Sequence, residues 1–221
     1  MLTLISPAKT FSSKGKFAER FPASSPRFLE EAHEIVGASL SLSQEELGRM
    51  LSLSPKLSKE VYHTQRTFFD DGVKELQAPL NYSGMVYRKL SAGTLSAEEW
   101  AYAEDHLRMT SFVYGLLRPS DLIRPYRMEG TAHIPGIGEG RIFDFWRDRL
   151  TPLFIEEVKR QGGTLLYLAS DEMRGLFHWE EVRRALGEER HPRVSSLRAV
   201  TDCVLETLTQ VEAAAAAASG V

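Results

Sequence analysis

An apolar run at residues 164–169 (Thr-Leu-Leu-Tyr-Leu-Ala) constrains the fold of this chain more than any other segment. A strand that is apolar almost throughout is typical of a central strand covered on both faces, as in α/β proteins. Ser170, Asp171 and Glu172 follow this strand directly. Polar groups at the carboxyl end of a buried strand occupy the usual ligand position of an α/β sheet. The run therefore predicts both a fold class and a place for a binding site.

The start of the chain predicts a second strand. Residues 2–5 (Leu-Thr-Leu-Ile) are followed by Ser6-Pro7, and Pro7 has no amide hydrogen with which to continue a sheet ladder. Ser6 and Lys9 therefore lie just past a strand end. The Lys9 ammonium offers three donors on a flexible stem, which suits an anion. A turn without a ligand is the alternative interpretation.

Helix-start signals separate these strands. Ser43-Gln-Glu-Glu46 and Ser96-Ala-Glu-Glu99 are capping boxes, and Ser25-Pro26 and Ser54-Pro55 place proline at the first helical position. Thr151-Pro152 predicts the start or a kink of a further helix. Together these patterns predict a single compact domain of mixed α/β class, with a mixed central sheet flanked by helices. Two other elements are expected, a weak strand over 80–86 and a helix after Pro192 that carries Cys203 in its apolar stripe.

Composition limits the function. Lys and Arg total 27 of the 221 residues against 30 Asp and Glu, a net charge of −3 that excludes a uniformly basic nucleic-acid binder but allows a local basic face. One cysteine excludes an intramolecular disulfide and a Cys-rich metal cage, and the six histidines lack metal-ligand spacing, so we predict no metal and no cofactor. Without a long apolar run or a signal sequence, we expect a cytoplasmic protein with no membrane partner.

Arginine and tyrosine alternate over residues 108–127. Guanidinium groups bind phosphate in a bidentate manner and aromatic rings stack on bases, so this mixture suits a nucleic-acid or nucleotide surface. The alternative left open is that these arginines are paired with acidic residues. The residues of this segment that carry the interpretation are Arg108, Tyr114, Arg118, Tyr126 and Arg127, and the acids that would pair with them are Glu104, Asp105, Asp121 and Glu129.

Two other patterns carry weaker signals. Ile134-Pro-Gly-Ile-Gly138 is similar to the hairpin of a helix-hairpin-helix module, although residues 128–133 do not have a helical pattern and a Gly-rich surface turn is the alternative. Ser170 and Asp171 lack the G-x-S-x-G turn of a hydrolase, and the chain has no P-loop and no dinucleotide-binding glycine motif.

A set of short motifs gives a more specific indication. The motifs are Ser6-Pro-Ala-Lys-Thr10, Gly84-Met-Val-Tyr87, Ala103-Glu-Asp-His-Leu-Arg108, Tyr114-Gly-Leu-Leu-Arg-Pro-Ser-Asp-Leu122, Pro125-Tyr-Arg-Met-Glu129, Phe145-Trp146 and Leu168-Ala-Ser-Asp-Glu172. Their order and approximate spacing over residues 1–180 resemble those of the YaaA family of bacterial peroxide stress proteins.

This resemblance implies a cytoplasmic protein of the hydrogen peroxide response that limits free intracellular iron. It also implies DNA binding by a mixed α/β fold with a basic cleft and a helix-hairpin-helix element. The predicted YaaA-like domain spans residues 1–192. We predict an atypical C-terminal helical tail over residues 193–221, which lack the Tyr-Ala-Lys-x-x-Arg-Gly segment of the family.

From these observations we predict that the chain binds duplex or distorted DNA. Lys9, Arg108, Arg118 and Arg127 would hold phosphates, Tyr114 or Tyr126 would stack on a base, and Ser6 and Ser170 would complete an anion site. We expect Lys9 and Arg127 to converge on one cleft, which could also hold a small anionic ligand. The alternative is an enzyme acting on nucleic acid or a nucleotide, with Asp171 or Glu172 as general base.

Overall fold

The computed structural model describes residues 1–187, so Cys203 and the predicted tail over 193–221 lie outside the described residues. The strands are β1 (Leu2–Ile5), β2 (Thr10–Phe11), β3 (Leu76–Gln77), β4 (Tyr82–Ser83), β5 (Leu107–Ser111), β6 (Gly115–Leu117), β7 (Leu122–Ile123) and β8 (Leu165–Tyr167). The helices are α1 (Leu29–Ser39), α2 (Gln44–Met50), α3 (Pro55–Arg66), α4 (Ala78–Asn81), α5 (Met85–Leu90), α6 (Ala97–His106), α7 (Ile142–Arg160) and α8 (Trp179–Leu186), with 3-10 helices η1 (Ala92–Thr94) and η2 (Asp171–Leu176).

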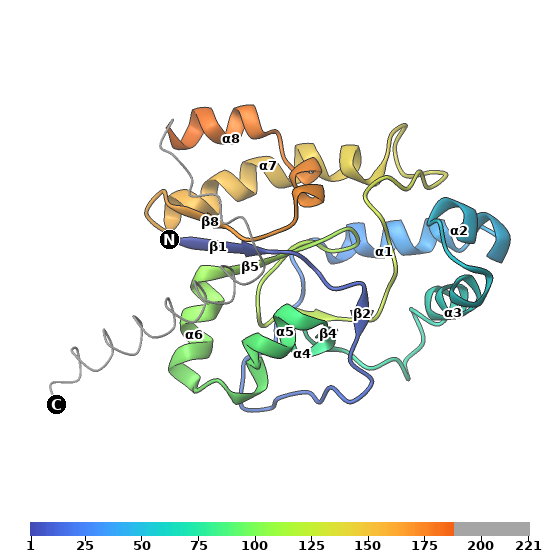
Figure 1. Cartoon of the computed structure of the whole chain (residues 1–221), viewed down its shortest axis with the longest axis horizontal. Helices are drawn as coiled ribbons and strands as arrows, with labels where there is room; N and C mark the ends of the chain where they lie inside the picture. The colour runs from blue at the N-terminus through green and yellow to red at the C-terminus, as the bar shows by residue number, and fades with distance from the viewer. Residues whose placement is uncertain (188–221) are drawn as a thin grey trace, which may run out of the picture.

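The main sheet is mixed, as predicted. Its strand order is β6-β5-β1-β8, with β1 parallel to both β5 and β8 and β6 antiparallel to β5. Figure 1 shows α7 and α8 on one side of this sheet and α4, α5 and α6 on the other, with α2 and α3 beyond the carboxyl ends of the parallel strands. The mixed α/β class and the compact single domain are therefore confirmed.

The position of β8 differs from the prediction. Within the described part of the chain β8 pairs with β1 alone, so β1 rather than β8 lies between two parallel strands. Leu165 and Leu166 are nonetheless buried. Helices pack over this edge strand, and its apolar composition therefore reports burial rather than a central place in the sheet.

Local signals fixed several helix starts correctly. Ser43 and Ser96 each accept a hydrogen bond from the backbone of the glutamate three residues later, and both capping boxes are complete. Ser54 caps α3 with Pro55 at the first helical position. The helix predicted at Ser25-Pro26 begins later, at Leu29.

Three predicted elements differ from the structure. The segment 80–86 forms the end of α4, the two residues of β4 and the start of α5 rather than one strand. Pro152 lies inside α7, which continues through it, so the helix start predicted there is wrong. Residues 124–141 contain no helix, so no helix-hairpin-helix element precedes α7. Ile134 and Ile137 are buried, and their packing against the core holds this segment as a loop.

Helix α7 provides the centre of the core. Trp146 is fully buried, and its indole N–H donates to the Phe112 carbonyl at 2.9 Å. Gly115, at the turn between β5 and β6, has φ +72°, and a Cβ there would lie 2.8 Å from the Trp146 ring. Glycine is required at this position both by the backbone conformation and by the close approach of the tryptophan. This packing fixes the β5–β6 turn, which borders the candidate site.

Candidate functional site

A pocket of about 100 Å³ lies at the carboxyl ends of the three parallel strands. Ser6 directly follows β1, Phe112 follows β5, and Ser170 follows β8 by a short extension. This is the position at which open α/β sheets bind ligands. The pocket is lined by Ser6, Pro7, Ala8, Lys9, Phe112, Tyr126, Arg127, Met128, Ser170, Glu172 and Met173.

Two serines join the strand ends at this pocket. The Ser170 backbone N–H donates to the Ser6 hydroxyl at 2.8 Å, and the Ser6 hydroxyl donates to the Ser170 hydroxyl at 3.2 Å. Tyr87 fixes the same loop, because its hydroxyl donates to the Ser6 carbonyl at 2.7 Å. With the hydrogen of Ser6 used in this way, the hydroxyl hydrogen of Ser170 is left for a ligand among the contacts of the described residues.

Lys9 and Arg127 converge on one carboxylate. The Lys9 ammonium lies 2.9 Å from Glu129 Oε2, and Arg127 donates to Glu129 Oε1 through Nη2 at 2.8 Å and through Nε at 3.1 Å. Arg127 Nη1 also donates to the Lys9 carbonyl at 3.4 Å. The structure thus brings Lys9 and Arg127 to the same pocket, as expected from the sequence.

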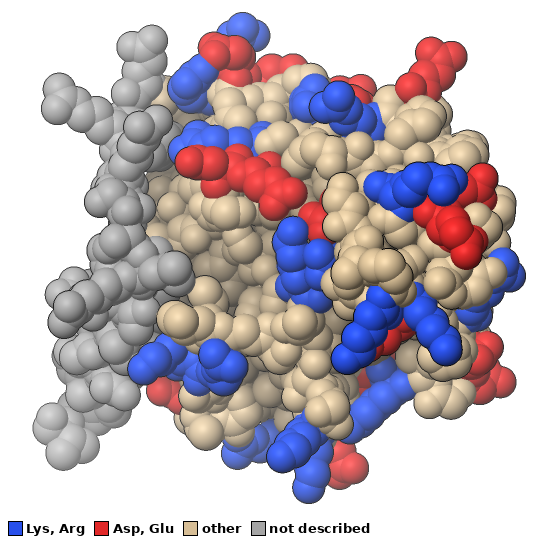
Figure 2. Space-filling view, turned by 45° about the vertical axis from the view of Figure 1, so that its right-hand side comes forward, with Lys and Arg blue, Asp and Glu red and all other residues tan. Residues whose placement is uncertain are grey.

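The charges around the pocket are balanced. Lys9 and Arg127 contribute two positive charges, while Glu129 and the pocket-lining Glu172 contribute two negative ones. Basic and acidic side chains are also interspersed on the face drawn in Figure 2. The predicted cleft is therefore a mixed polar pocket with a cationic side rather than a uniformly basic surface.

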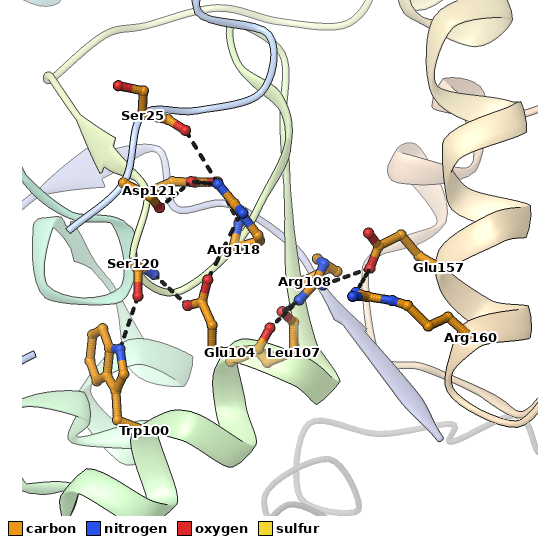
Figure 3. Close-up of polar contacts among 11 residues, drawn as sticks. Ser25, Trp100, Glu104, Leu107, Arg108, Arg118, Ser120, Asp121, Glu157 and Arg160 are labelled. Carbon is orange, nitrogen blue, oxygen red and sulfur yellow. Dashed lines mark hydrogen bonds and ion pairs between the residues drawn. The ribbon is translucent and has the colours of Figure 1, made fainter. Parts of the chain in front are cut away.

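Arg108 does not belong to this site. Its side chain is only 3% exposed, and its guanidinium donates to Glu157 Oε2 at 2.6 Å and to the carbonyls of Glu104 and Leu107 (Figure 3). A guanidinium enclosed in this way cannot reach a phosphate. The prediction that Arg108 binds phosphate is corrected: Arg108 joins β5 to α7.

Arg118 remains half-exposed but is paired. Its guanidinium donates to Asp121 Oδ1 at 2.8 Å and lies 3.9 Å from Glu104, as Figure 3 shows. The hydrogen bond with the buried Asp121 carboxylate raises the pKa of Arg118. Arg118 does not line the pocket, so any phosphate contact that it makes is separate from the one at Lys9 and Arg127.

Neither predicted stacking tyrosine has a free ring face. Tyr114 is fully buried, and its hydroxyl accepts the Arg124 backbone N–H at 3.0 Å. Tyr126 is also buried, although its ring borders the pocket, and its hydroxyl is bonded to Ser111 and Tyr82, each at 2.7 Å. Because stacking needs an exposed face, Tyr114 is removed from the candidate site and Tyr126 is retained as a pocket wall.

The two candidate general bases differ in position. Asp171 is 97% exposed, pairs with Arg174 at 3.2 Å and does not line the pocket. Glu172 lines it. The side chain of Asp171 is therefore corrected to a surface position, and Glu172 is the carboxylate available to a bound ligand.

Comparison with known proteins agrees with the motifs. The family described as peroxide stress protein YaaA matches residues 1–194. This chain belongs to the YaaA peroxide stress protein family. A UPF0246 protein of Porphyromonas gingivalis is 44% identical over 186 residues, which cover 84% of this chain and 73% of that protein. A UPF0246 protein of Bacteroides fragilis is 45% identical over 185 residues (83% and 71%), and one of Clostridium botulinum is 34% identical over 176 residues (78% and 67%).

Sequence reasoning missed part of the pocket of this YaaA family member. Glu129 was considered only as a partner of arginine, although its place two residues after Arg127 in an extended segment puts both side chains on one side of the backbone. Phe112 directly follows the end of β5, a strand that the sequence analysis did not single out. Met128 and Met173 have no polar signal, and only the structure places them at the site.

Two observations concern ligands and membranes. In residues 1–187, no group of three or more His, Cys, Asp and Glu side chains is arranged to hold a metal ion. None of the helices in that range combines the length and apolar character needed to cross a bilayer.

Proposed function

We propose that this chain acts in the bacterial response to hydrogen peroxide by binding DNA in the cytoplasm, with backbone phosphates held by Lys9 and Arg127. The observation that carries the proposal is the convergence of these two cations at the carboxyl ends of the parallel strands. Membership of the peroxide stress family supports the physiological role. As the family resemblance implies, we include the lowering of free intracellular iron in the proposal.

Glu129 supports phosphate binding by orienting both cations. Its carboxylate accepts hydrogen bonds from Nε and Nη2 of Arg127 and from the ammonium of Lys9. Arginine has five donors and lysine three, so each retains N–H groups for a second partner. A pre-oriented arginine loses less side-chain freedom when it binds a phosphate. We therefore expect Glu129 to help rather than prevent the contact, and Arg118 to add a phosphate contact outside the pocket.

The test is a fluorescence anisotropy titration of a labelled duplex over a series of salt concentrations. Arg127→Ala should weaken binding to every duplex sequence and reduce the slope of log K against log salt by about one unit. Arg49→Ala, which removes an exposed arginine of α2, is the matched control and should keep the slope. An unchanged slope for Arg127→Ala would exclude this residue from the interface, and absence of binding at low salt would refute DNA binding itself.

A second candidate function is catalysis on a nucleic acid or nucleotide. It is favoured by Glu172, which lines the same pocket as Lys9 and could accept a proton while the ammonium stabilises developing negative charge. Loss of turnover in Glu172→Gln with ligand binding retained would support this function. Equal turnover in the variant and the unchanged protein would eliminate Glu172 as the base.

A further inference from the structure

The pocket has three kinds of surface, of which a DNA phosphate alone would use only one. Lys9 and Arg127 provide a cationic side, Glu172 provides a carboxylate, and Phe112 with two methionines provides an apolar wall. Lys9 is 57% exposed, so the cationic side lies at the rim. Phe112, in contrast, is buried, so the apolar wall lies deeper. The pocket therefore changes from charged to apolar between its mouth and its interior.

We propose that this pocket binds a free nucleoside monophosphate, with the phosphate at the rim and the base inside. The phosphate would accept hydrogen bonds from Lys9, Arg127 and the Ser170 hydroxyl. Phe112, Met128 and Met173 are nearly fully buried, so the base would touch only the parts of these side chains that line the pocket, where edge and thioether contacts with a planar ring are favourable. Mononucleotide binding does not depend on DNA binding, although the two ligands share the cationic rim.

The charge balance determines which ligand the pocket accepts. Lys9 and Arg127 attract an anion and are oriented by Glu129, whereas the Glu172 carboxylate on the same lining repels a phosphate ion that binds alone. The Glu172 carboxylate favours ligand binding only when the ligand donates an N–H hydrogen bond to it. Every nucleobase carries such a donor, and a hydrogen bond to a charged acceptor is stronger than one between neutral groups. A ligand with both an anionic group and an N–H donor is thus preferred over either part alone.

The size of the pocket agrees with this orientation. Its volume of about 100 Å³ is below the roughly 300 Å³ at which sites begin to enclose a whole drug-sized ligand. Room for a planar base inside and an open rim outside fits a nucleobase and its phosphate, respectively. A folded oligonucleotide or a duplex cannot enter.

The experiment is isothermal titration calorimetry of the full chain with AMP, adenosine and inorganic phosphate. AMP should bind at least about 10-fold more tightly than either adenosine or phosphate, because only AMP engages both ends of the pocket. Arg127→Ala should weaken AMP binding by about 10-fold or more, and Arg49→Ala, the matched exposed arginine of α2, should leave it unchanged. Phosphate binding as tight as AMP binding would overturn the proposal, as would absence of AMP binding.

Two further variants test other parts of the pocket lining. Ala8→Leu adds an apolar group to the lining without changing a charge and should weaken AMP binding by at least about 10-fold. Glu172→Gln alters an exposed position where folding is not at risk, and it should weaken AMP binding while phosphate binding does not fall. AMP affinity unchanged in Glu172→Gln, or increased, would overturn the assigned role of the carboxylate.

Titrations of the unchanged protein separate this proposal from DNA binding. DNA binding without AMP binding would reject the mononucleotide site alone. AMP binding without DNA binding would reject the proposed function alone, and the pocket would then be a small-molecule site.

Discussion

One glutamate of α7 accepts hydrogen bonds from two arginines in very different environments. Glu157 Oε2 lies 2.6 Å from the Arg108 guanidinium, which is 3% exposed, and 2.7 Å from that of Arg160, which is 51% exposed. Arg108 also satisfies two backbone carbonyls. Removing a buried partner leaves an uncompensated charge and unpaired acceptors, whereas an exposed partner is replaced by water.

Arg108→Ala should therefore lower the free energy of unfolding by about 3 kcal/mol, at the lower end of the range for a broken buried pair, because Arg160 still compensates Glu157 in part. Arg160→Ala should lower it by less than about 1 kcal/mol. Urea unfolding of the two variants and the unchanged chain makes the comparison. Equal losses for the two arginines would contradict the assigned difference in burial.

The arginines also mark where residue-level prediction succeeds. Lys9 and Arg127 were expected to lie close together and do line one pocket, because Lys9 follows a strand end and Arg127 lies in a half-buried segment without regular secondary structure after Pro125. Arg108 has the same chemistry in β5, where helix α7 covers it. Residue type states which partner an arginine can bind, but only packing decides whether that partner is a phosphate or Glu157.

Helix α7 carries a proline in its interior. Pro152 is exposed and cannot donate to the Asp148 carbonyl four residues earlier, which costs about 3 kcal/mol relative to alanine in a helix interior. The neighbouring Thr151 adds two hydrogen bonds. Its hydroxyl donates to the Arg147 carbonyl at 2.7 Å and accepts the His178 N–H at 2.9 Å. The helix therefore continues through Pro152, held by these hydrogen bonds and by the buried Leu150 and Leu153 on either side.

Pro152→Ala should raise the free energy of unfolding by about 2 kcal/mol, since the restored helical hydrogen bond is offset by about 1 kcal/mol of greater freedom in the unfolded chain. Glu156→Ala, another exposed position of α7, should change it by less than about 0.5 kcal/mol. Thermal unfolding followed by circular dichroism measures both variants. A lower midpoint for Pro152→Ala would show that the proline shapes a bend on which packing depends.

Elements with local signals were predictable, and those fixed by distant contacts were not. The boxes at Ser43 and Ser96 satisfy their own backbone groups, so their sequence pattern is sufficient. The segment 80–86 has no such capping pattern. Asn81 donates to the distant Ile123 carbonyl and Tyr82 bonds to Tyr126, and these tertiary contacts divide the segment between α4, β4 and α5. The pocket combines both kinds of element. Its strand ends could be predicted from the local sequence, whereas its apolar walls come from residues that are distant in the sequence.

Buried tyrosine hydroxyls join elements across the whole molecule. Tyr82 in β4 bonds to Tyr126 after β7, and Tyr126 bonds to Ser111 at the end of β5. Tyr87 in α5 reaches the Ser6 carbonyl after β1. Burial raises the pKa of Tyr126 to about 12 and raises those of Tyr82 and Tyr87 well above the ordinary value. In the folded chain these phenols therefore stay neutral at a pH at which exposed tyrosines ionise.

Because the tyrosine pKa values differ between the folded and the unfolded chain, the free energy of unfolding falls at alkaline pH. A tyrosine with a folded-state pKa above its unfolded value of about 10 stabilises the fold fully below pH 10, and that stability is lost as the pH rises through the folded-state pKa. Each such tyrosine should contribute a fall of about 1.4 kcal/mol per pH unit between about pH 10 and pH 12.

Tyr126→Phe should lower stability near pH 7 by about 1–3 kcal/mol, because it leaves two hydroxyl partners unpaired. It should also make the alkaline fall shallower by the contribution of one tyrosine. Urea unfolding at a series of pH values tests both effects, and an alkaline slope in Tyr126→Phe identical to that of the unchanged chain would show that Tyr126 ionises without unfolding.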